Sequence, residues 1–129
     1  MNKTIVTTAA ILICLAIVLG AIGAHSVKKM VDSDGLDIFK TGVNYQMYMG
    51  LGLLAVGLNA DKFVFQLKWF FRFGFGGVLI FSGLLYVLAF KEFHGLNFLG
   101  AIVPIGGTLM IVSWVILIYN LLRSPKTNS

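Results

Sequence analysis

The feature that most constrains this chain is its division into four long stretches without a charged residue. These stretches cover residues 4–24, 41–60, 73–90 and 96–122. A helix needs about 20 apolar residues to cross the hydrocarbon core of a bilayer. Transmembrane strands are shorter and alternate in polarity, and the stretches do not alternate. The pattern therefore predicts four transmembrane helices.

Composition supports a membrane environment. The chain is 58% hydrophobic and 12% charged, whereas soluble domains are about a quarter charged. A chain of 129 residues buries a limited fraction of its surface, so lipid must cover the remaining apolar side chains. We expect an all-α integral membrane protein with one four-helix antiparallel bundle. The expected helices cover residues 4–24, 35–58, 70–90 and 97–122, and Asp34 is the expected N-cap of the second.

The first stretch has a second interpretation. Lys3, the apolar run and the small residues Ala21, Gly23 and Ala24 resemble a secretory signal peptide. The run is longer than a typical signal core, and three further spans follow it. We therefore expect a retained helix, in which Cys14 is a small apolar residue.

The distribution of cations predicts the orientation. The N-terminus, the second link and the tail carry six Lys and Arg, namely Lys3, Lys62, Lys68, Arg72, Arg123 and Lys126. The first and third links carry four, namely Lys28, Lys29, Lys40 and Lys91. The positive-inside rule then places both termini in the cytoplasm and His25 and His94 outside.

The formal net charge of +5 does not indicate nucleic-acid binding, because the cations sit at the edges of apolar runs. Anionic lipid headgroups are the expected counterpart. In the link 61–72, Lys and Arg alternate with Phe and Trp, which is the composition of a membrane interface.

Reactive motifs are absent from the sequence. None of the four stretches contains Asp, Glu, Lys or Arg, the usual groups of proton relays and ion pathways. There is no phosphate loop, nucleophile elbow or metal-ligand spacing. His25 and His94 are interpreted as structural residues at helix ends. We expect no catalytic residues, no metal and no cofactor.

Neutral polar residues form the one candidate cluster. It consists of His25, Tyr45, Gln46, Tyr48 and Tyr86. Asn44 and Tyr48 share a helix face, whereas Gln46 lies about 200° round from Asn44. The cluster is interpreted either as interhelical hydrogen bonding or as a solute site. Because lipid cannot satisfy an amide, Gln46 should turn toward another helix, with Tyr86 or His25 as its partner.

Glycines and one proline are candidates for close helix packing. Small residues let helices in lipid approach closely. The residues expected at helix contacts are Gly20, Gly23, Gly50, Gly83, Gly100, Pro104, Gly106 and Gly107. Pro104 should also kink the fourth helix, because proline removes a backbone hydrogen bond.

Four segments carry a family resemblance. They are residues 20–25 (GAIGAH), 39–48 (FKTGVNYQMY), 81–86 (FSGLLY) and 99–107 (LGAIVPIGG). With Trp114, they make the chain similar to the YgdD/YwdK-type family of small bacterial membrane proteins, which has eukaryotic transmembrane relatives. The family usually has His where this chain has Met49, and Ser where it has Leu84. The resemblance implies a four-helix fold in the plasma membrane and no particular activity.

Three functions remain open from the sequence. The first is a non-enzymatic interaction or assembly module, whose partners are the bilayer, a second copy or other membrane proteins. The second is a small oligomeric channel or transporter. An intramembrane enzyme ranks last, because no residues support one.

Overall fold

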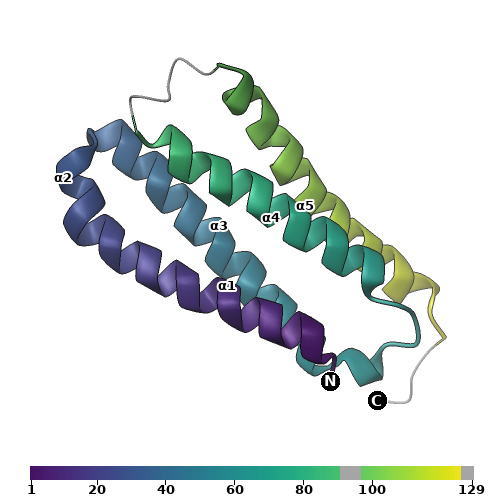
Figure 1. Cartoon of the computed structure of the whole chain (residues 1–129). Helices are drawn as coiled ribbons and strands as arrows, with labels where there is room; N and C mark the ends of the chain where they lie inside the picture. The colour runs from purple at the N-terminus through teal and green to yellow at the C-terminus, as the bar shows by residue number, and fades with distance from the viewer. Residues whose placement is uncertain (91–96, 126–129) are drawn as a thin grey trace.

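The computed structural model describes residues 1–90 and 97–125, and the regular structure in them is helical. Four long helices run side by side (Figure 1), namely α1 (Lys3–Ile22), α3 (Ser33–Leu58), α4 (Lys68–Leu88) and α5 (Asn97–Arg123). Helices that follow one another in sequence pack against one another: α3 contacts α1 and α4, and α4 contacts α5. The all-α fold expected from the sequence is confirmed.

The first helix continues past its expected end at residue 24. A π-helical turn, η1 (Gly23–Val27), leads directly into α2 (Lys28–Met30). The chain then turns, and the Asp32 carboxylate accepts from the backbone N–H of Gly35 at 2.8 Å. Asp32 is therefore the N-cap of α3, and the expectation that Asp34 fills this role is wrong. The connection between α3 and α4 holds a short 3-10 helix, η2 (Ala60–Lys62).

The four helices differ in how well they suit a membrane. By length and apolar composition, Lys3–Met30, Lys68–Leu88 and Phe98–Arg123 can each cross a bilayer. The fourth long helix, α3, is long enough to cross and carries no charged residue in 41–60, but it is more polar than the other three. Its central turns contain Asn44, Tyr45, Gln46 and Tyr48. The structure places this polar helix between α1 and α4, where part of its surface is buried.

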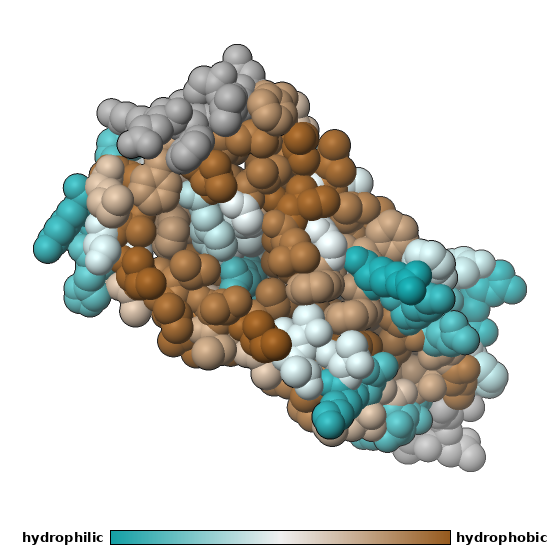
Figure 2. Space-filling model, viewed as in Figure 1, coloured by the Kyte–Doolittle hydropathy of each residue, from teal (hydrophilic) through white to brown (hydrophobic). Residues whose placement is uncertain are grey.

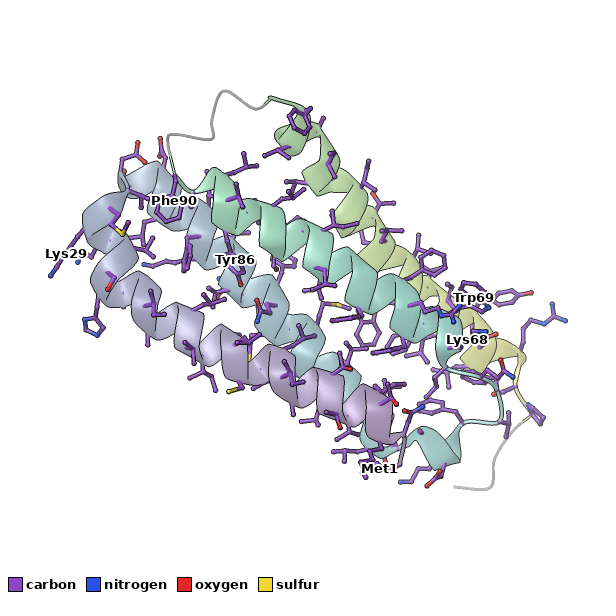
Figure 3. All side chains as sticks on the ribbon, in the orientation of Figure 1. Met1, Lys29, Lys68, Trp69, Tyr86 and Phe90 are labelled. Carbon is purple, nitrogen blue, oxygen red and sulfur yellow. The ribbon has the colours of Figure 1, made fainter. Side chains whose placement is uncertain are left out.

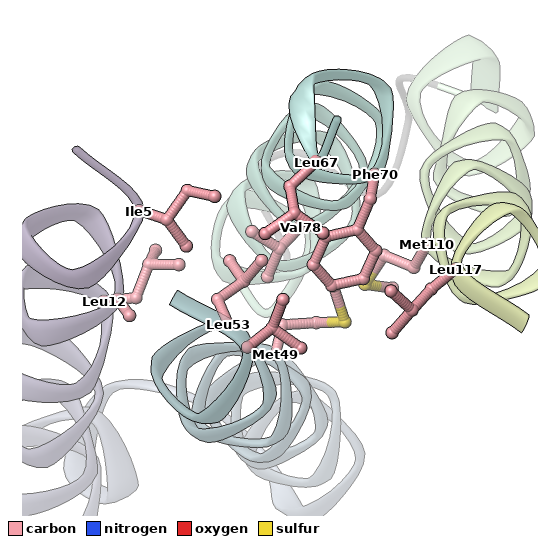
Figure 4. Close-up of a cluster of buried hydrophobic side chains, with 11 residues drawn as sticks. Ile5, Leu12, Met49, Leu53, Leu67, Phe70, Val78, Met110 and Leu117 are labelled. Atoms are coloured by element: carbon pink, nitrogen blue, oxygen red, sulfur yellow. The ribbon is translucent and has the colours of Figure 1, made fainter. Parts of the chain in front are cut away.

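The main apolar core draws on all four long helices (Figure 4). It includes Ile5 and Leu12 of α1, Met49 and Leu53 of α3, Phe70 and Val78 of α4, and Met110 and Leu117 of α5. A smaller cluster of Val27, Phe39 and Ala89 lies near the turn from α2 to α3. These residues exclude lipid from the contacts between neighbouring helices.

Glycines lie where neighbouring helices approach one another most closely. A Cβ on Gly50 of α3 would lie 2.8 Å from Ile13 of α1. A Cβ on Gly106 of α5 would lie 2.6 Å from the backbone nitrogen of Phe81 and 2.9 Å from the carbonyl oxygen of Gly77, both in α4. Contacts with backbone atoms cannot be relieved by a rotamer change, so the α4–α5 crossing requires glycine at these positions.

The remaining packing candidates divide into two groups. A Cβ on Gly23 would lie 2.9 Å from the Phe39 ring, and Gly20 and Gly107 would make ordinary contacts at 3.7 and 3.5 Å. Gly83 and Gly100 would meet no described atom within 4 Å, so the expectation that they lie at helix contacts is wrong.

Helix periodicity explains this correction. Gly83 lies six residues after Gly77, and Gly100 six residues before Gly106, which turns each about 240° round its helix. The two helices also separate beyond the crossing, toward the start of α5 (Figure 1). Pro104 lies inside α5, which is continuous from Asn97 to Arg123. The carbonyl that loses its hydrogen bond to proline belongs to Gly100.

The α4–α5 crossing gives a matched pair of substitutions. Gly106→Leu should reduce the free energy of unfolding by about 1–3 kcal/mol or more, because the new side chain meets backbone atoms. Gly83→Leu should change it by less than about 0.5 kcal/mol, because its side chain enters open space. Thermal unfolding of both variants in mild detergent measures the difference. Equal melting temperatures for the two variants would contradict this assignment.

Candidate functional site

The polar centre of the molecule is the side chain of Gln46, which is 5% exposed near the middle of α3. Its Nε2 donates to the backbone carbonyl of Leu12 in α1 at 2.8 Å. Its Oε1 accepts from the hydroxyl of Tyr86 in α4 at 2.6 Å. One carboxamide therefore links three helices at a depth where lipid offers no hydrogen bonds.

The surroundings of Tyr86 fix its position. A Cβ on Gly42 would lie 2.7 Å from the Tyr86 ring, so glycine makes room for the ring. The Tyr86 ring also packs against Phe39, with centroids 5.0 Å apart. The buried Ser82 hydroxyl donates to the Gly42 carbonyl at 2.7 Å, which ties α4 to α3 one turn away. Ser82 is a structural residue that the sequence analysis did not single out.

The five residues of the predicted cluster do not all meet. Gln46 and Tyr86 are hydrogen-bonded, as expected. His25 is exposed on the π-helical turn and is not a partner of Gln46. Tyr45 and Tyr48 are 43% and 60% exposed and stack edge to face with each other, away from Gln46. The cluster is therefore an interhelical link plus a separate pair of tyrosines.

The two tyrosines line a groove of about 390 Å³ between α3 and α5. Its walls and floor are Tyr45, Tyr48, Met49, Phe81, Gly107, Met110, Ile111 and Trp114. At one side of this groove, the Trp114 indole N–H donates to the Met49 sulfur at 3.2 Å. Met49 stands where the resembled family has His, and its role in this structure is to connect α3 with α5.

The exposed side of α3 carries a row of residues spaced four, three and four apart. We call Asn44, Tyr48, Leu51 and Ala55 the lipid-facing stripe; all four are exposed. The side chains of Asn44 and Tyr48 have no hydrogen-bond partner among the described residues. At 1.5 Å per residue, they lie about 6 and 12 Å along the helix from Lys40, which is within the uncharged span 41–60. The sequence signal for this stripe is the four-residue spacing of Asn44 and Tyr48.

The stripe lies opposite a row of buried small residues. Gly35, Gly42, Gly50 and Gly57 are buried and spaced seven, eight and seven apart, with Gln46 midway between the second and third. This spacing puts them on one face of α3. Of these four glycines, only Gly50 was expected at a helix contact, although the regular spacing of all four is visible in the sequence.

No metal site is formed by the described residues. Within residues 1–90 and 97–125, no three His, Cys, Asp or Glu side chains gather closely enough to hold an ion. The second histidine, His94, lies outside the described residues. The arrangement that remains can hold helices together and can present polar groups to the bilayer.

The two amides of α3 should respond differently to the same substitution. Gln46→Leu removes two interhelical hydrogen bonds and should reduce the free energy of unfolding by about 1–2 kcal/mol. Asn44→Leu, on the exposed side, should leave the stability of the single chain within about 0.5 kcal/mol. Unfolding of both variants in detergent at monomeric concentrations tests the pair. A larger loss for Asn44→Leu would show that the two faces are wrongly assigned.

Comparison with known proteins identifies the family. A family model described as "Protein of unknown function (DUF423)" matches residues 19–107. The UPF0382 membrane protein YwdK of Bacillus subtilis is 37% identical over 121 residues, which cover 90% of this chain and 94% of that protein. A UPF0382 membrane protein of Haemophilus influenzae is 36% identical over 118 residues, covering 88% and 87% of the two chains.

A third relative, a UPF0382 membrane protein of Staphylococcus saprophyticus, is 36% identical over 116 residues, which cover 90% of this chain and 94% of that protein. No solved structure matches this chain. The resemblance found in the sequence is thus confirmed over most of its length. The chain belongs to the UPF0382 (DUF423) family of membrane proteins.

Proposed function

We propose that this chain is a non-enzymatic interaction and assembly module of the bacterial plasma membrane. The observation that carries the proposal is the lipid-facing stripe of α3, where Asn44 and Tyr48 have no hydrogen-bond partner among the described residues. Lipid chains provide neither donors nor acceptors for these groups. A second protein surface over the stripe would satisfy them.

The surface of the molecule is consistent with this placement in a bilayer. In Figure 2, brown apolar residues cover most of the middle of the visible face, and teal polar residues gather toward its two ends. At one end, the cations of Lys68 and Arg72 lie 5.7 and 5.2 Å from the Trp69 ring centroid. Aromatic rings with cations are typical of the membrane–water interface.

The absence of ionisable groups from the spans supports a non-enzymatic role. Residues 4–24, 41–60, 73–90 and 97–122 contain no Asp, Glu, Lys or Arg. Proton relays and ion pathways within a membrane usually depend on such groups, so their absence argues against proton-coupled transport. The polar side chains of α3 are neutral amides and phenols, which suit recognition and packing.

A small oligomeric channel is the second candidate. The same stripe favours it, because polar side chains facing lipid in one copy can line a water-filled path within a ring of copies. Solute or ion flux in proteoliposomes distinguishes the two. An assembly module predicts no flux above that of empty vesicles.

We infer that both termini face the cytoplasm. Figure 3 shows Lys68 at the end of the molecule that holds Met1, and Lys29 at the opposite end. Lys3 begins α1, Lys62 lies in η2, Arg72 lies near the start of α4 and Arg123 ends α5, so these four share the end of Met1, whereas Lys28 and Lys40 flank the turn from α2 to α3. The exposed N-terminal amine of Met1 also pairs with the Asp61 carboxylate at 2.5 Å, so the N-terminus and the second link share one side.

Cysteine labelling tests this orientation. In a Cys14→Ser background, Ser26→Cys should react with an impermeant maleimide from outside. Labelling of Ser129→Cys instead would reverse the topology.

A photo-crosslinking experiment in native membranes tests the assembly proposal. A benzophenone amino acid in place of Tyr48 should give a discrete crosslinked band, because the stripe is covered by protein. The same amino acid in place of Ile118, which is 54% exposed on α5, is the control and should crosslink mainly to lipid. Only lipid adducts at both positions would refute an assembly role for α3.

A further inference from the structure

The lipid-facing stripe is polar toward the N-terminal end of α3, and apolar toward the C-terminal end. On the C-terminal side of Tyr48, the stripe continues with Leu51, which is 51% exposed, and with Ala55. At the end nearest α2, Asp37 and Lys40 extend the same side of α3, and both are exposed. Neither forms a salt bridge with a described residue. A partner for this side must therefore offer an amide, apolar contact and charges of both signs, each at a defined depth.

A second copy of the same helix meets each of these requirements. A carboxamide is both donor and acceptor, so Asn44 can satisfy Asn44 of another copy. Two copies inserted in the same direction are related by a two-fold axis along the membrane normal, which brings like residues to the same depth. Small residues such as Ala55 allow close approach of the helices.

The charges at the α2 end complement each other under the same symmetry. Asp37 and Lys40 are three residues apart on one side of α3, so they are neighbours on the helix surface. A two-fold axis between two α3 helices brings Asp37 of one copy toward Lys40 of the other, and the reverse. Residues 41–60, which follow this pair along α3, carry no charge, so like charges do not oppose each other within the bilayer.

We propose that two copies of this chain dimerise through the lipid-facing stripe of α3, with Asn44 facing Asn44 across a two-fold axis. The inference rests on the proposed assembly function and names its partner. Dimerisation would leave the buried Gln46 network unchanged, because Gln46 lies about 200° round the helix from Asn44.

Disulfide crosslinking maps the interface. In a Cys14→Ser background, Leu51→Cys and Ala55→Cys should each form disulfide dimers when membranes are treated with copper phenanthroline. A disulfide requires Cα atoms within about 7 Å, so only residues near the two-fold axis react. The controls are Ile118→Cys on α5 and the wild-type chain, whose single Cys14 is exposed on α1. Both controls should remain monomeric.

Substitutions of Asn44 and the charged pair test the chemistry. Asn44→Leu should lower the dimer association constant about three- to thirty-fold, and Asn44→Gln should largely retain it. Lys40→Asp and Asp37→Lys should each weaken the dimer, and the double variant should restore it. Unfolding of the single chain monitors folding in each case, so a loss of dimer is separable from misfolding.

The outcomes separate the inference from the proposed function. Disulfides at Ile118 but not at residues 51 and 55, or no effect of Asn44→Leu on dimer formation, would overturn the inference. If Tyr48 crosslinks to a different protein and the α3 cysteines give no dimer, the assembly function stands and the homodimer is rejected. Lipid adducts alone, with no disulfide dimer, would reject both.

Discussion

The structure depends on how one polar helix is accommodated in an apolar molecule. α3 carries the carboxamide of Gln46 near its middle, where the bilayer cannot satisfy it. The Leu12 carbonyl on one side and the Tyr86 hydroxyl on the other provide the missing partners. These partners come from α1 and α4, so satisfying the amide requires α3 to lie between these two helices.

Glycines make this arrangement sterically feasible. Gly42 and Gly50 lie four residues before and after Gln46 on the same face, where α4 and α1 approach α3 closely. With side chains there, the helices would separate and the hydrogen bonds of Gln46 would lengthen. The buried side chains of α3 are thus hydrogen-bonded, whereas on its exposed side Asn44 and Tyr48 have no hydrogen-bond partner among the described residues. This contrast between the two sides is the basis for placing a protein partner on the exposed one.

Sequence reasoning recovered the helical class and approximate spans, because uncharged stretches of membrane length are a strong signal. It also predicted that Gln46 turns toward another helix with Tyr86 or His25 as its partner, since lipid cannot satisfy an amide, and the structure selects Tyr86. It misplaced Gly83 and Gly100, because glycine content does not reveal which face of a helix meets a neighbour. The Asp32 cap is a local contact with Gly35, and it was misassigned because Asp32 and Asp34 both offer a carboxylate at the start of this helix. The π-helical turn was missed because nothing in the expected helix 4–24 marks its continuation past residue 24.

A double-mutant cycle tests the central claim most directly, namely that the Gln46 amide bonds across helices. Gln46→Leu, Tyr86→Phe and the double variant would be unfolded reversibly in bicelles. The structure predicts a favourable coupling energy of about 0.6 kcal/mol, and up to about 1.7 kcal/mol, between the two side chains. Strictly additive effects, with zero coupling, would show that Gln46 and Tyr86 do not interact and would contradict this account of the fold.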